Sequence, residues 1–173
     1  VASQSSTTLT KNQDMTPITF SNSGGAVDSW NIWPSIPNGL NFGNNNGTIW
    51  GTPTVNLTST IFTIYANNTG GSASTTVTIT INEEIPTINY PNQTYNFTRG
   101  QMITSIIPAL SGGEIASFEI SPDLPNGLDL SANGIISGTP TVNLTQTVFI
   151  VWANNSGGSD NTTITITINE PLS

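Results

Sequence analysis

The chain has 173 residues, with two lysine or arginine residues against ten acids, no cysteine and no histidine. Two cations cannot neutralise a run of phosphates, so the composition argues against a nucleic-acid partner and against docking to an anionic membrane surface. The lack of cysteine excludes disulfides and thiolate metal sites, and no apolar run approaches the roughly 20 residues that span a bilayer.

In the first half of the chain, apolar and polar residues alternate in short segments. This period of two predicts β-strands with one buried and one solvated face. Asn and Gly between the last two segments tolerate the positive φ of a hairpin loop, and Pro37-Asn38-Gly39 predicts a further turn. The predicted strands are 15–20, 29–33, 48–52, 58–66 and 73–82.

The second half shows the same alternation, and no segment of the chain has helical periodicity with caps. Ile164, Ile166 and Ile168 alternate with threonine, and both residue types are β-branched and suit a pleated sheet. Many short strands separated by Pro, Asn and Gly indicate an all-β sandwich. The predicted strands are 87–90, 94–98, 102–107, 115–121, 134–138, 145–154 and 160–169.

The two halves repeat one another. Residues 51–58 recur as 138–145, and residues 62–72 recur as 149–159. The turn at 37–40 recurs as 125–128, one residue out of that register. We therefore predict two domains, residues 1–84 and 85–173, each of about 85 residues and able to fold alone. In a tandem array each repeat contacts only its neighbours, so we expect an elongated arrangement of the two domains.

The repeated motifs resemble a known family. Leu-Pro-Asn-Gly-Leu at 124–128, Gly-Ile-Ile-Ser-Gly-Thr-Pro-Thr at 134–141 and Ala-Asn-Asn-Ser-Gly-Gly-Ser at 153–159 are similar to the "putative Ig domain" repeats. Such repeats occur in tandem in bacterial and archaeal surface proteins and are related to cadherin-like and dystroglycan-type modules. The resemblance implies extracellular, immunoglobulin-like β-sandwiches and no catalytic residues.

The start of the first domain differs from that of the second. Residues 85–90 predict a leading strand whose counterpart would precede Val1, so the first strand of domain one is expected to be missing or supplied in trans. A strand from a neighbouring chain could complete the edge by β-augmentation. The alternative is that the polar residues 1–10 pair there themselves.

Alternation also separates the core from candidate contact residues. Trp30 and Ile32 share a face, so Trp33 points the other way. Trp33, Trp50, Tyr65 and Trp152 are predicted to lie outside and to form an interface or ligand platform. The alternative is cover by loops or by the adjacent domain. The predicted core comprises Ile18, Phe20, Trp30, Ile32, Leu40, Ile49, Phe62, Ile64, Ala66, Val77, Ile79, Ile81, Ile106, Phe118, Ile120, Leu128, Ile136, Phe149, Val151, Ala153, Ile164, Ile166 and Ile168.

Two kinds of surface chemistry remain. Glu83 and Glu84 at the domain junction are candidates for a structural calcium site. The alternative is that they are solvated acids of the linker. No other metal site and no cofactor is expected. Eight Asn-x-Ser/Thr sequons occur, a number that this composition gives largely by chance. The candidate N-glycosylation sites are Asn46, Asn56, Asn67, Asn92, Asn96, Asn143, Asn154 and Asn161.

These features predict a non-enzymatic structural repeat of an extracellular filament, stalk or surface layer, assembling through strand edges and exposed aromatics. Its partners would be other copies of itself, flanking repeats or glycans, without nucleic acid or membrane insertion. The alternative function is an adhesion or carbohydrate-binding module that uses Trp33 and Trp50.

Overall fold

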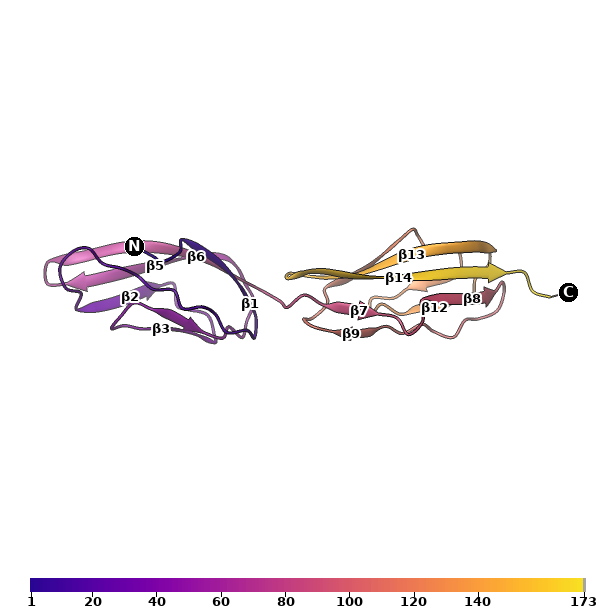
Figure 1. The fold of residues 1–173 in the computed structure, drawn as a ribbon, viewed down its shortest axis with the longest axis horizontal. Helices are drawn as coiled ribbons and strands as arrows, with labels where there is room; N and C mark the ends of the chain where they lie inside the picture. The colour runs from indigo at the N-terminus through magenta and orange to yellow at the C-terminus, as the bar shows by residue number, and fades with distance from the viewer. Residues whose placement is uncertain (173) are drawn as a thin grey trace. The chain divides into compact units, whose positions relative to one another are not determined.

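A computed structural model describes residues 1–172 of the chain. The chain forms two compact units, Val1–Glu83 (unit 1) and Glu84–Ser173 (unit 2) (Figure 1). Within residues 1–172 all regular structure is β-strand, which confirms the predicted all-β class. No helix in this part of the chain is long and apolar enough to cross a membrane.

Unit 1 is a sandwich of two layers. Four strands form one layer in the order β1-β6-β5-β2, with β1 parallel to β6 and the other pairs antiparallel. The other layer is the pair β3-β4, extended by bridges from Ile18 to Ile49 and from Ala2 to Phe20. The strands are β1 (Ser6–Thr10), β2 (Ser29–Trp33), β3 (Leu40–Phe42), β4 (Ile49–Gly51), β5 (Leu57–Asn68) and β6 (Gly71–Asn82).

Unit 2 repeats this topology. Its main sheet has the order β10-β13-β14-β8, with β8 parallel to β14. The pairs β11-β12 and β7-β9 and a bridge from Ile106 to Ile136 form the second layer. The strands are β7 (Thr87–Asn89), β8 (Thr94–Thr98), β9 (Ala109–Ser111), β10 (Ser117–Ser121), β11 (Leu128–Leu130), β12 (Ile136–Gly138), β13 (Leu144–Asn155) and β14 (Gly158–Asn169).

Each unit buries its own apolar cluster between the layers. Most of the predicted core residues are buried, and Ile32, Ala66, Phe118 and Ile120 are partly buried against the same clusters. Side chains of β5 and β6 alternate inward and outward as predicted, with Phe62 inside and Ile61 outside. The hydrophobic core residues that the sequence pattern did not reveal are Met15, Ile88, Tyr90 and Ile103.

Two predicted strands were wrong in extent. Residues 15–20 and 102–107 make only isolated bridges, at Ile18, Phe20 and Ile106. Pro17 lies within the first segment and Pro108 directly follows the second, and proline has no N–H to give to a ladder. The strands β1, β3, β9 and β11 were not predicted, because β3, β9 and β11 have only three residues each and β1 has a single large apolar residue.

The first residues of unit 1 lie where unit 2 has its leading strand. Val1 exchanges hydrogen bonds with Ser21, and the Ser3 N–H donates to the Thr19 carbonyl. This is the register in which Asn89 pairs with Ala109 in unit 2. Val1 is therefore the counterpart of Asn89. That another chain supplies the counterparts of the β7 residues before Asn89 stays a prediction.

Two glycines hold equivalent places beneath an aromatic side chain of the main sheet in each unit. Gly47 and Gly134 have φ values of 70° and 75°, which favour glycine. A Cβ on Gly47 would lie 2.7 Å from the Trp30 ring, and one on Gly134 would lie 2.7 Å from Phe118. The loop before β4 and the loop before β12 are thereby packed closely onto the main sheets.

Candidate functional site

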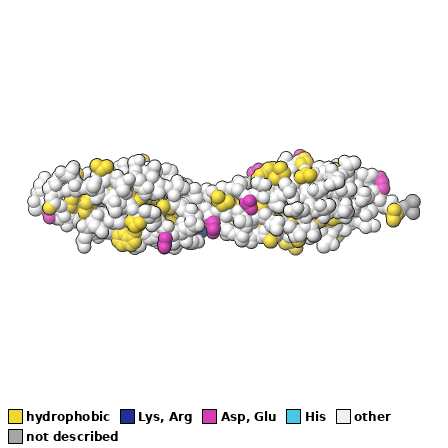
Figure 2. Space-filling model, viewed as in Figure 1, with side chains coloured by type: hydrophobic (Ala, Val, Ile, Leu, Met, Phe, Trp, Pro, Cys, Tyr) yellow, Lys and Arg dark blue, Asp and Glu magenta, His cyan; other side chains and the backbone are white. Residues whose placement is uncertain are grey.

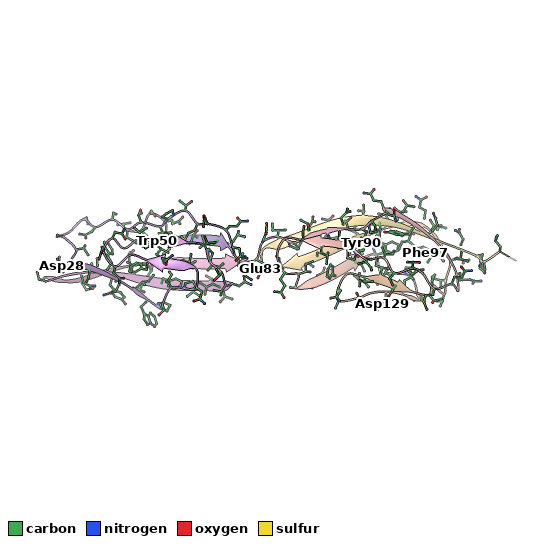
Figure 3. The ribbon with its side chains drawn as sticks, turned by 90° about the horizontal axis from the view of Figure 1, so that it is seen from below. Asp28, Trp50, Glu83, Tyr90, Phe97 and Asp129 are labelled. Carbon is green, nitrogen blue, oxygen red and sulfur yellow. The ribbon has the colours of Figure 1, made fainter. Side chains whose placement is uncertain are left out.

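Each unit contains one cationic side chain, Lys11 in unit 1 and Arg99 in unit 2. Each of them lies in an equivalent hydrogen-bonded cluster at one end of its unit. In unit 1, Glu83 Oε1 accepts hydrogen bonds from Lys11 Nζ at 2.9 Å and from Asn56 Nδ2 at 2.8 Å. Glu83 follows the end of β6, and Figure 3 labels it. Hydrogen bonding to Lys11 and then to Asn56 holds the pKa of Glu83 below its usual value. We call this cluster the unit 1 latch.

Unit 2 has an equivalent latch. Arg99 Nη2 donates to Glu170 Oε2 at 2.6 Å, and Asn143 Nδ2 donates to Glu170 Oε1. Sequence reasoning did not identify either latch, although both cations follow the first parallel strand of their repeat and the Asn and Glu recur in register. The latches connect three segments at one end of each sandwich, so their role is structural.

The calcium hypothesis finds no cluster of ligands. Among residues 1–172, no group of three or more His, Cys, Asp or Glu side chains is placed to hold a metal ion. Glu83 is committed to its latch, and the Glu84 carbonyl accepts a hydrogen bond from Asn155. Calcium binding by Glu83 and Glu84 stays an untested prediction.

The outward side of the main sheet of unit 1 carries exposed apolar side chains. Ile61, Thr63 and Tyr65 follow one another along β5, and Trp33 on β2 is paired with Thr63. Trp33 is 70% exposed and Ile61 is 61% exposed. The neighbouring strand β6 adds only threonine and serine on this side, at positions paired with β5. We call Trp33, Ile61, Thr63 and Tyr65 the β5 face.

Unit 2 presents a related surface on β13. Val148, Ile150 and Trp152 point outward, and Val148 is 55% exposed. Glu119 on β10 is paired with Trp152, so this surface carries a charge that the β5 face lacks. In the view of Figure 2, hydrophobic side chains form separate groups among uncharged polar ones. Each unit therefore offers discrete apolar contacts on a polar sheet.

Trp33 and Trp50 do not lie on one surface. Trp50 is in β4, paired with Asn41 in the layer that does not contain β5, and it is 40% exposed while Ile49 beside it is fully buried. Alternation predicts that each of the two side chains lies outside but does not predict which layer its strand joins, and their use as an interface or ligand platform stays a prediction. Trp152 is only partly exposed.

The sequons occupy different surroundings. Most of the eight are exposed, but Asn67 and Asn154 are partly buried within β5 and β13 rather than in turns. Asn56 and Asn143 donate to the latch carboxylates. Glycosylation stays a prediction at all eight sites.

Comparison with known proteins assigns both units to one family. A family model described as "Putative Ig domain" matches residues 1–82 and 85–169. Two curated relatives are both "Serine-rich adhesin for platelets" of Staphylococcus aureus, the second from strain MRSA252. Each is 30% identical over 90% of this chain, which spans only 7% and 12% of their lengths.

Solved structures show the same fold. Four immunoglobulin domains of Sidekick-1 match 94% of this chain and 46% of that chain, with a TM-score of 0.56 and 12% identity. Eight immunoglobulin domains of Down Syndrome Cell Adhesion Molecule match 96% of this chain and 25% of that chain, with a TM-score of 0.53 and 12% identity. The fold prediction of tandem immunoglobulin-like sandwiches is confirmed.

Proposed function

Because the chain belongs to the putative Ig domain family along both units, we propose that it is a structural and adhesive repeat of an extracellular surface protein. The adhesins that share 30% identity with it support a surface role without catalysis. Within such a protein the two units would act as rigid modules that hold contact surfaces away from the cell. Its partners would be other copies of itself or flanking repeats.

The observation that carries this proposal is the β5 face. Its backbone is paired on both sides of β5, so the outward side chains are held on a stiff support. Large aromatic side chains on such a support supply contact area at low cost in conformational entropy, and they commonly anchor interfaces. Trp33 and Ile61 are the most exposed members of this surface.

The scarcity of charge supports the same role. Uncharged threonine, serine and asparagine supply most of the polar surface. The β5 face itself has no charged residue, so contact between two β5 faces would not be opposed by like charges at close range. Assembly into a filament, stalk or surface layer would then use these faces together with sheet edges. This is the structural function that we place first.

Bead assays test the proposal directly. Beads coated with the chain should clump with one another or adhere to surfaces of the source organism. The double variant Trp33→Ser, Ile61→Ser should lose most of this adhesion while remaining folded. Thr76→Ser, an exposed change paired with Thr63 on β6, is the matched control. Equal adhesion by wild type and the double variant would contradict a role for the β5 face.

Carbohydrate binding is the second candidate, and one observation favours it. Trp33 lies beside polar side chains, with Thr63 paired to it and Asn31 two positions earlier on the same side of β2. An exposed ring with neighbouring hydrogen-bonding groups suits a sugar. Adhesion that soluble glycans inhibit in proportion to dose would favour this candidate, whereas adhesion insensitive to glycans would favour protein contacts.

A further inference from the structure

The unit 1 latch brings an amine, an amide and a carboxylate together. Glu83 Oε1 accepts one hydrogen bond from Lys11 Nζ at 2.9 Å and another from Asn56 Nδ2 at 2.8 Å. A single oxygen atom therefore lies against both nitrogens. An amine held beside a primary amide can replace the nitrogen of that amide, provided that a neighbouring group moves the protons.

The backbone holds the three residues in this arrangement. Lys11 directly follows β1, Asn56 directly precedes β5 and Glu83 directly follows β6. The Lys11 N–H donates to the Asn82 carbonyl at 2.8 Å, so the lysine continues the register of β1 along β6. Groups that neighbouring strands hold side by side react as if at a very high local concentration.

We propose that the unit 1 latch is a site of covalent modification, in which Lys11 and Asn56 form an intramolecular isopeptide bond. Lys11 Nζ would bond to Cγ of Asn56, and the bond from Cγ to Nδ2 would break. Glu83 takes a proton from the lysine ammonium group, which makes the amine nucleophilic, and delivers it to the departing nitrogen. Two protons leave Nζ in turn and depart with that nitrogen as ammonium, so Glu83 ends as the carboxylate it was. No oxidant, cofactor or second substrate is needed.

Two features of Glu83 suit this proton transfer. The oxygen that contacts the attacking Nζ also contacts the departing Nδ2, so one carboxylate reaches both nitrogens. The Glu83 side chain is 12% exposed and that of Lys11 is 27% exposed, which removes much of the water that would stabilise separate charges. The ion pair is the resting state and only its minor neutral form reacts. We therefore expect linkage to be slow and to follow folding, so that the freshly folded chain still has the ion pair.

Unit 2 keeps the latch without the reactive amine. Arg99 stands there in place of lysine, and its guanidinium stays protonated and is not a nucleophile. Arg99 and Asn143 also contact different oxygens of Glu170, whose side chain is 55% exposed. Because Lys11 is the only lysine of the chain, a lysine cross-link can form in unit 1 alone, and unit 2 serves as an internal control.

The bond would change how unit 1 carries load. It would join residues 1–11 through an amide to residues 56–83. A pull along the chain would pass through this amide, and residues 12–55 would carry none of it. The closed loop would also restrict the unfolded chain, so linked unit 1 should melt at a higher temperature than unlinked unit 1.

Mass spectrometry of the full chain tests the proposal. A species lighter by one ammonia molecule should accumulate as the purified chain is kept at mildly alkaline pH. Trypsin cleaves an unfolded chain after lysine and arginine, which here means after Lys11 and Arg99. Because an acylated lysine is not cleaved, the linked chain should give residues 1–99 as one fragment, lighter by one ammonia molecule. The unlinked chain should give fragments 1–11 and 12–99.

Two variants provide the controls, and circular dichroism checks that both are folded. Lys11→Arg keeps a cation beside Glu83 but has no amine, so it should lose no ammonia. Glu83→Gln cannot carry the proton and should link at least about 100-fold more slowly, the usual contribution of a general base. Loss of ammonia from Lys11→Arg would assign the change in mass to another asparagine and overturn the proposal. Complete cleavage after Lys11 in the wild type after prolonged incubation, or equal linkage in Glu83→Gln, would also overturn it.

Discussion

Lys11 Nζ lies 2.9 Å from Glu83 Oε1, and it joins the residue after β1 to the residue after β6. Arg99 and Glu170 repeat the contact in unit 2, although there both side chains are more exposed. The chain places its only two cations in this one role. The cations are therefore used to close the ends of the sandwiches and are not spread over the surface for solubility.

The unit 1 latch predicts a loss of stability in acid. Because folding lowers the pKa of Glu83, the stabilisation is present above the unfolded pKa and is lost as pH falls through the folded pKa. Glu83→Gln should cost about 1 kcal/mol at pH 7 and flatten the dependence below about pH 5. Calorimetry from pH 2 to pH 7 measures this, with Glu170→Gln as the control in the more exposed pair. An unchanged acid profile in Glu83→Gln would contradict the assignment.

The buried Tyr90 predicts that unit 2 loses stability at alkaline pH. Its hydroxyl donates to the Gly134 carbonyl at 2.6 Å inside the sandwich (Figure 3), and burial raises its pKa to about 12. Stability is present below the unfolded pKa of about 10 and is lost as pH rises towards 12. Tyr90→Phe should cost about 1 kcal/mol at pH 7 and remove this alkaline loss. Melting temperatures of the wild type and of Tyr90→Phe, measured between pH 8 and pH 12, test this prediction. The same pH dependence in both proteins would contradict it.

The two loop glycines should tolerate no side chain. Gly47→Ala and Gly134→Ala place a Cβ 2.7 Å from an aromatic ring at a positive φ, and each should lose more than about 1 kcal/mol. Gly24→Ala is the matched control, since its Cβ would make only an ordinary contact of 3.6 Å with Asn22. Urea unfolding of the three variants compares them. A loss in Gly24→Ala equal to that in Gly47→Ala would refute the steric argument.

Neighbouring residues on β5 should respond in opposite ways. Phe62 is buried and Ile61 points outward, so Phe62→Ala should cost about 3–5 kcal/mol whereas Ile61→Ser should change stability by less than about 0.5 kcal/mol. Val148 and Phe149 form the same pair in unit 2. Urea unfolding checks each pair, and a large loss in Ile61→Ser would mean that this side of β5 is covered within the unit.

Period-two alternation predicted the long strands because Phe62, Ile64, Val77 and Ile79 repeat it without interruption. It could not predict β1, in which Leu9 is the only large apolar side chain among serine and threonine and the pairing partner β6 is distant in sequence. Tyr90 was missed for a related reason: the acceptor of its hydroxyl inside the sandwich is the Gly134 carbonyl, 44 residues away in sequence. Local patterns carry no information on such partners.

For the candidate surfaces, too, the sequence predicts which side chains point outward but not which layer they belong to. The outward position of Trp33 follows from its neighbours Trp30 and Ile32, but the layer to which Trp50 belongs depends on the pairing of β4 with β3.

Immunogold electron microscopy of intact cells of the source organism, with antibodies against this chain, tests the surface role most directly. The account predicts label on the outer cell surface or on material that extends from it. Label confined to the cell interior would contradict it.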